Sequence, residues 1–157
     1  MSLARSTSRL EAEVAIPAAR EQVFAYLARL ENHWQLADRW IEVAHLDSNA
    51  GERGPINGGA VRVRGPLGVS RTVRTRVVGV EAPGRIHGHA EIGSRTRAAV
   101  DWSLAGEGSV TRVRLAAEIE ALGPLDRVLW AAGGRLWMER RFERVLDGLR
   151  RRFAARA

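Results

Sequence analysis

Residues 123–153 read GPLDRVLWAAGGRLWMERRFERVLDGLRRRF, and the rest of the chain is organised around this stretch. Its apolar side chains recur at helical spacing in two stripes, which are offset by roughly a third of a turn. Pro124 suits a first helical turn, and the paired glycines Gly133 and Gly134 favour a kink. We therefore predict one long bent helix from Pro124 to about Phe153, with its back half docked on a core. The front stripe is Leu125, Val128, Leu129, Ala132 and Leu136, and the back stripe is Met138, Phe142, Val145, Leu146, Leu149 and Phe153.

Composition indicates one domain large enough for a core, in a chain of 157 residues. We assign that domain to residues 9–153 and expect residues 1–8 to be flexible. No stretch resembles a transmembrane span or a secretory leader, so we expect a cytoplasmic protein without stable membrane insertion. The absence of cysteine excludes disulfides, thiolate nucleophiles and Cys-ligated zinc. The net charge is +7, and all 25 basic residues are Arg, a bias that weakens any argument from basicity alone.

Upstream of the final helix the pattern predicts a helical pair embedded in strands. Residues 9–16 alternate strictly between apolar and polar, which is typical of a half-buried strand. Pro17 opens a helix to about Leu30, and a second helical turn follows over 31–34. Glycines and a proline predict a loop over 47–59. The remaining strands are expected at 40–46, 60–64, 69–80, 85–92, 95–104 and 110–121.

The later strands carry valines on one side and arginines on the other, as a one-sided antiparallel sheet requires. The order of elements therefore predicts an α+β fold in which the sheet grips the C-terminal helix. The outward arginines are Arg62, Arg64, Arg74, Arg76, Arg95, Arg97, Arg112 and Arg114.

Three segments resemble the START-type (SRPBCC) superfamily, which includes polyketide cyclases/dehydrases, lipid-transfer domains and the birch-pollen allergen. They are EAEVAIPAAREQVFAYLARLENHWQLADRW (11–40), VVGVEAPGRI (77–86) and VDWSLAGEGSVTRVRLAAEIE (100–120). The resemblance implies a helix-grip fold: a curved antiparallel sheet around a long kinked C-terminal helix, with two short helices after the first strand. It also implies an internal cavity for hydrophobic ligands, and we expect no cofactor. We expect Leu136, Met138 and Phe142 to face the sheet, with the preceding turns forming one wall of the cavity mouth.

Two histidines are candidates for acid–base chemistry. His33, beside Asn32 at the expected cavity mouth, has an ordinary pKa near neutrality and could assist enolisation of a ligand. A packed turn with a capping Asn explains the same residues, and we prefer that interpretation. His45 shares the inward parity of its strand, but a single inward His is more often a hydrogen-bonded core residue.

Seven residues are candidates for lining a ligand cavity, because aromatic walls suit planar or acyl ligands. Ordinary core packing is the alternative for each of them. Polar groups on the inward parity are few, namely Thr75, Thr96, Arg71 and His45, so the pocket is better suited to orient a ligand than to transform it. The seven candidates are Tyr26, Trp34, Trp40, Trp102, Trp130, Trp137 and Met138.

His87 and His89 point to the same side of one strand, roughly 6–7 Å apart, with Glu91 continuing the row. That row also carries Arg85, which places it on the solvent side, and no convincing third ligand is apparent. We therefore predict no metal site.

Three functions stay open on these observations. The first is a carrier or sensor that binds a hydrophobic small molecule or lipid, as a monomer or homodimer. The second is a cyclase/aromatase-like enzyme that uses His33 or His45 in the same cavity. The third is binding of an anionic partner, a nucleic acid or a membrane surface, through the arginine face. The absence of interleaved aromatic residues there argues against nucleic acid, and the acids Glu91, Asp101, Glu118 and Glu120 are expected to relieve the charge.

Overall fold

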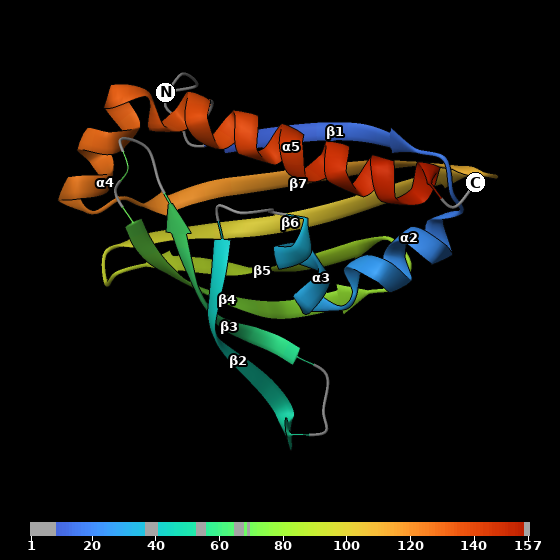
Figure 1. Cartoon of the computed structure of the whole chain (residues 1–157), viewed down its shortest axis with the longest axis horizontal. Coiled ribbons are helices and arrows are strands. Elements are labelled where there is room, and N and C mark those ends of the chain that lie inside the picture. Colours follow the sequence, from blue (N-terminus) through green and yellow to red (C-terminus); the bar gives the residue numbers. More distant parts are fainter. Residues whose placement is uncertain (1–8, 37–40, 53–55, 65–67, 69, 156–157) are drawn as a thin grey trace.

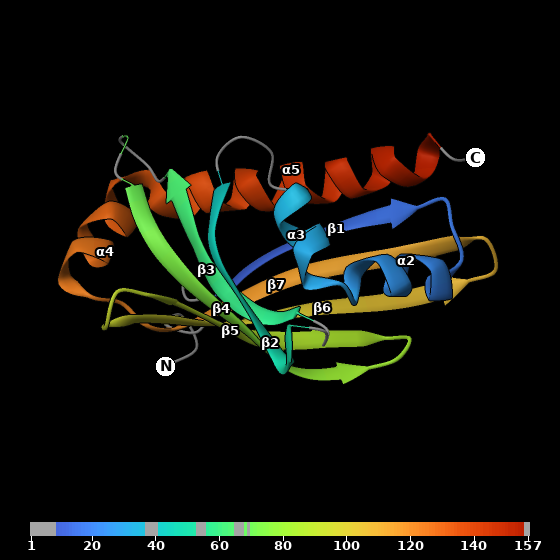
Figure 2. The same cartoon turned by 60° about the horizontal axis from the view of Figure 1, so that its bottom comes forward.

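The computed structural model describes residues 9–36, 41–52, 56–64, 68 and 70–155, and it has the predicted α+β helix-grip architecture. Within this part of the chain, seven strands form one antiparallel sheet in the order β1-β7-β6-β5-β4-β3-β2. The sheet curves beneath the last helix, which lies along β1 (Figures 1 and 2). The strands are β1 Arg9–Ile16, β2 Ile41–Glu52, β3 Ile56–Arg64, β4 Ser70–Glu81, β5 Arg85–Ile92, β6 Thr96–Glu107 and β7 Val110–Ala121. Residues 1–8 lie outside the described part, as does Trp40.

Two short helices follow the first strand, as predicted, although their division differs. The helix expected from Pro17 to about Leu30 is replaced by α2, Arg20–Leu27, and α3, Leu30–Gln35. The connection from β1 to α2 is held to the sheet by Thr111 of β7, whose buried hydroxyl donates to the Ala18 carbonyl at 2.7 Å. Val23, Phe24 and Leu27 of α2 are buried against the core.

The loop predicted over 47–59 is wrong, because β2 continues to Glu52 and β3 begins at Ile56. Gly58 and Gly59 are paired with Arg76 and Thr75 of β4. A Cβ atom on Gly58 would lie 2.7 Å from the Thr75 carbonyl oxygen. Glycine at this position permits a close approach of two strands. A glycine in a sequence can therefore indicate close strand packing as well as a turn.

The long C-terminal helix is interrupted at the paired glycines, which confirms the predicted kink. It consists of α4, Pro124–Leu129, one π-helical turn over Trp130–Gly134, and α5, Arg135–Ala154. Gly133 has φ 112°, a left-handed conformation that residues with a Cβ rarely adopt. The helix therefore changes direction at this turn, so α4 covers one end of the sheet while α5 runs along it (Figure 1).

The back stripe of the helix is buried except for Met138 and Phe142, which are partly buried, whereas the front stripe faces largely outward. Leu136 was expected to face the sheet and is instead 52% exposed, while Val128 is 64% exposed. A π turn contains more residues per turn than an α-helix, so it rotates the residues before it relative to those after it. The front-stripe side chain that is buried is Leu129. The buried back-stripe residues of α5 are Val145, Leu146, Leu149 and Phe153.

The main core lies between α2, the back half of α5 and strands β1, β6 and β7. Leu149, Ile16 and Val113 are fully buried there, and Trp102 belongs to the same cluster. A smaller cluster surrounds Leu30 of α3 and Val61 of β3. Within the described part of the chain, no helix is long and apolar enough to cross a membrane.

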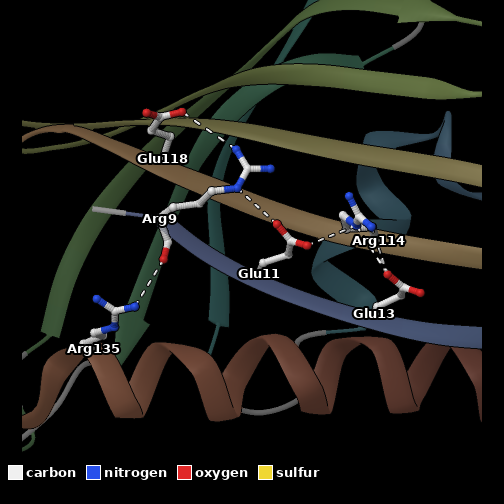
Figure 3. A network of polar contacts seen from close by, with 6 residues as sticks. All are labelled: Arg9, Glu11, Glu13, Arg114, Glu118 and Arg135. Carbon is white, nitrogen blue, oxygen red and sulfur yellow. Dashed lines mark hydrogen bonds and ion pairs between the residues drawn. The ribbon is translucent and has the colours of Figure 1, made fainter. Parts of the chain in front are cut away.

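The convex face of the sheet carries ion pairs across neighbouring strands, as Figure 3 shows for β1 and β7. Arg114 contacts Glu11 at 3.1 Å and Glu13 at 3.2 Å, and the Arg135 side chain reaches the Arg9 carbonyl at 3.4 Å. Of the four acids expected to relieve the charge of this face, Asp101, Glu118 and Glu120 form ion pairs with its arginines, and Glu91 forms none within the described residues. Further pairs are Arg9–Glu118, Arg85–Asp101, Arg97–Glu120 and Arg112–Glu13.

We expect Leu149→Ala to lower the free energy of unfolding by about 2–5 kcal/mol, because it leaves a cavity in the main core. Leu136→Ala makes the same chemical change on the same helix at an exposed position, and it should cost less than about 0.5–1 kcal/mol. Urea unfolding followed by circular dichroism measures both values. Equal costs for the two variants would contradict the described docking of α5.

Gly133→Ala should destabilise the protein by about 1 kcal/mol or more, because alanine is strained at φ 112°. Gly148→Ala is the matched control in α5. Its added Cβ would lie 3.7 Å from the nearest atom, the Leu36 carbonyl oxygen, which is ordinary contact. That change should stabilise by up to about 1 kcal/mol through helix propensity. Thermal unfolding should therefore shift in opposite directions for the two variants.

Candidate functional site

A cavity of about 330 Å³ lies between the concave face of the sheet and the C-terminal helical segments. Its size falls in the lower part of the range of small-molecule sites, about 300–1,000 Å³. Strands β3 to β7 supply most of one side, and α4, the π turn and α5 supply the other. Most wall residues are apolar, among them Val61, Val63, Val73, Val77, Ile92, Ala98, Val100, Ala117 and Ile119.

Four of the seven candidate ligand-lining residues meet in this wall: Trp102, Trp130, Trp137 and Met138. Trp102 comes from β6, whereas the other three flank the bend in the C-terminal helix. The π turn brings Trp130 and Trp137 to the same wall. Aromatic surface therefore faces the cavity from two separate elements, an arrangement suited to an apolar ligand.

Tyr26 is not among the described residues that line the cavity, so it does not join the other four candidates. Its ring packs edge-on against Phe153 with centroids 5.8 Å apart, and Arg152 lies 4.6 Å above it. This face of α2 is thus used to hold the end of α5. The side chains of Trp34 in α3 and His45 in β2 lie outside the described part, as does the whole of Trp40.

His33 of α3 lies in the cavity wall, with its ring centroid 5.2 Å from that of Trp102. Its Nε2 is 2.5 Å from the Leu27 carbonyl oxygen. A carbonyl can only accept, so Nε2 carries the proton and Nδ1 is the basic nitrogen. Burial lowers the pKa of His33 below its ordinary value of 6.5, and the Leu27 hydrogen bond and the Glu31 charge oppose this only in part. His33 is therefore neutral at pH 7.

A polar cluster closes the opposite end of the cavity. Arg71 of β4 forms a two-pronged ion pair with Asp126 of α4, at 2.6 Å from Nη1 to Oδ1 and 3.2 Å from Nη2 to Oδ2. The Thr96 hydroxyl of β6 donates to the same carboxylate and accepts the Gly123 N–H at 2.9 Å. These contacts fasten the first turn of α4 to two strands of the sheet.

Arg71, Thr75 and Thr96 were predicted to point inward, and all three line the cavity. The Thr75 hydroxyl is buried and has no hydrogen-bond partner within the described structure. Asp126 was missed, because a single acid in a first helical turn is also explained by the helix dipole. The signal that could have found it is the inward Arg71, which needs a counter-charge when it is partly buried.

His87 and His89 of β5 border the cavity but do not form a metal centre. The His87 ring lies against Gly79 of β4, and His89 Nδ1 is 4.0 Å from Glu120, whose side chain belongs to the convex face. No group of three or more His, Cys, Asp or Glu side chains within the described residues could hold a metal ion.

The arrangement can enclose and orient an apolar molecule. His33 lines the cavity and its Nε2 proton is used by the Leu27 carbonyl, so its Nδ1 is the candidate for accepting a proton from a ligand. The carboxylate of Asp126 is already engaged by three donors, so it does not form a free acid–base partner for His33.

A family model for polyketide cyclase / dehydrase and lipid transport matches residues 7–154. Among curated proteins, none matches the sequence significantly. Several solved structures share the fold. The Thermus thermophilus protein TTHA0849 is 22% identical, with a TM-score of 0.69 over 95% of this chain and 99% of that one. A START superfamily protein from Mycobacterium smegmatis is 18% identical, with a TM-score of 0.66 over 95% and 99% of the two chains.

We expect the free energy of unfolding to fall as the pH drops below about 6.5. Below that pH the unfolded chain binds a proton at His33, whereas the lowered pKa delays this protonation in the folded chain. Between pH 7.5 and 5.5 this residue accounts for at most about 1.4 kcal/mol. His33→Gln, which keeps a donor for Leu27, should lose less stability over the same interval in urea titrations. An identical loss in both proteins would show that His33 is not buried in its neutral form.

Proposed function

The chain belongs to the polyketide cyclase/dehydrase and lipid transport family, and from that premise we propose that it binds a hydrophobic small molecule or lipid as a carrier or sensor. The observation that carries the proposal is the apolar cavity of about 330 Å³ between the sheet and the bent helix. Burying apolar ligand surface there yields about 25 cal/mol per Å². A ligand that fills the cavity therefore gains its affinity mainly from apolar burial.

The wall supports binding more than turnover. Proton transfer needs a titratable group within hydrogen-bond reach of the ligand, and efficient catalysis usually pairs an acid with a base. His33 is neutral and could supply one such group through Nδ1, whereas Asp126 is bound to Arg71 and Thr96. The proposed ligand contacts are Trp102, Trp130, Trp137 and Met138, with Thr75 as a hydrogen-bonding group.

A second function, assisted cyclisation of a bound polyketide chain, has the position of His33 in its favour. The two functions leave different molecules in the protein. Native mass spectrometry of protein purified from its own host should detect a co-purifying lipid or unreacted hydrophobic molecule if the protein is a carrier. A cyclised polyketide would favour the enzyme, and turnover that is lost in His33→Gln would then assign the proton transfer to that residue.

Filling the cavity should abolish binding. Ala98 lines the cavity on β6, so Ala98→Phe places a ring in the ligand volume and should weaken binding of the neutral dye N-phenyl-1-naphthylamine at least tenfold. Dye fluorescence and quenching of the cavity tryptophans measure the affinity.

Ala105→Phe is the matched control, because Ala105 lies on the same strand with its side chain exposed. That variant should bind the dye as wild type does. Equal binding by both variants would show that the dye does not enter this cavity and would remove the main support for the proposal.

A further inference from the structure

The polar end of the cavity carries no net charge. Within the described residues that line the cavity, the arginines and acids are Arg71, Arg76 and Asp126, and Arg76 belongs to the exposed row of β4. Arg71 and Asp126 are largely buried, with side chains 21% and 12% exposed, and they neutralise each other through two parallel contacts. His33 at the other end is neutral, so the two ends of the cavity together present no net charge to a ligand.

The two histidines of β5 are directed away from the apolar interior. His87 and His89 border the cavity from the row of β5 that also carries Arg85 and Glu91. His89 Nδ1 lies 4.0 Å from Glu120 of the convex face, and the His87 ring lies against Gly79 of β4. Both imidazoles therefore belong to the row opposite the apolar wall residues Ile86, Ala90 and Ile92.

An anionic ligand has no cation available at either end of this interior. To reach Arg71, a carboxylate would have to displace Asp126, which would then be buried with only Thr96 and water as partners. Leaving one member of a buried ion pair without its partner is strongly unfavourable. A fatty acid in its ionised form therefore meets a barrier that a neutral molecule of the same length does not.

The interior does offer hydrogen bonds to a neutral oxygen. The Thr75 hydroxyl is buried without a partner in the described structure, and a buried hydroxyl in that condition is unfavourable until something satisfies it. Thr75 lies two strand positions beyond Val73 on the same inward row as Arg71, in the middle of the β4 wall. A ligand hydroxyl or carbonyl oxygen at this level would satisfy it without bringing a charge.

We propose that the cavity selects neutral apolar ligands that carry a hydroxyl or carbonyl oxygen, and that the Arg71–Asp126 pair sets this selectivity by excluding ionised ligands. The inference rests on the proposed function, since it concerns what the same cavity binds. Control of ligand charge differs from a purely structural role for the Arg71–Asp126 ion pair. A pair that only anchored α4 would affect stability but would not govern the charge of the ligand.

The test compares three probes of equal chain length at pH 8: dodecan-1-ol, dodecanoate and dodecylammonium. Each displaces N-phenyl-1-naphthylamine, which reports the affinity. The wild-type protein should bind dodecan-1-ol at least tenfold more tightly than either charged probe. Asp126→Asn keeps the side-chain shape but leaves Arg71 unpaired, so it should reverse the preference toward dodecanoate. Arg71→Gln leaves Asp126 unpaired and should favour dodecylammonium.

The double variant Arg71→Gln/Asp126→Asn is the matched control, because it restores a neutral interior. It should return the preference to dodecan-1-ol even if it is less stable than wild type. Circular dichroism checks folding throughout, and if one single variant fails to fold, the other single variant and the double variant still give the comparison.

Two results would overturn the inference: a wild-type protein that binds dodecanoate as tightly as the alcohol, or folded single variants with unchanged preference for ligand charge. Failure of all probes, with the dye also unbound, would contradict the proposed function itself and the inference with it. Dye binding with no charge discrimination would contradict the inference alone.

Discussion

Burial of the back stripe of α5 against the sheet is the interaction on which the rest of the structure depends. Leu146 and Leu149 are at most 2% exposed, and each such side chain contributes about 1.5–3 kcal/mol when it leaves water. This packing fixes α5 along β1 and closes the core at one end of the sheet. Because the bend turns α4 away from that line, the other half of the helical layer does not collapse onto the strands. An apolar cavity beside a packed core is the consequence.

The α4 end of the helical layer is held to the sheet by polar contacts instead of apolar packing. Arg71, Thr96 and Asp126 join β4 and β6 to the first turn of α4, so the wall is fixed in place without filling the space behind it. Apolar packing strong enough to do the same would have occupied the cavity. The ion pair thereby has two effects, since it positions α4 and also leaves this end of the interior without net charge.

Charge on the convex face follows different physics from charge in the cavity. Arg85, Arg97 and Arg114 face solvent and pair with acids on neighbouring strands, contacts that contribute little individually because water screens them. Arg62, Arg64, Arg74 and Arg76 of β3 and β4 have no ion pair within the described part of the chain. The described ion pairs of this face thus lie over β1 and β5 to β7.

The sequence by itself determined the strand alternation, the bend at Gly133 and Gly134 and the buried back stripe, because each depends on local periodicity or on backbone freedom that only glycine has. It also identified Arg71, Thr75 and Thr96 as inward, since the parity of a strand is a local property. Only the tertiary structure decided that 47–59 is largely strand, that Leu136 faces outward and that Asp126 joins Arg71. Those outcomes depend on strand pairing, on the break in helical geometry at Gly133 and on contacts between residues 55 positions apart. Local pattern carries no information about such distances, so the cavity and its charge emerge only when the chain is folded.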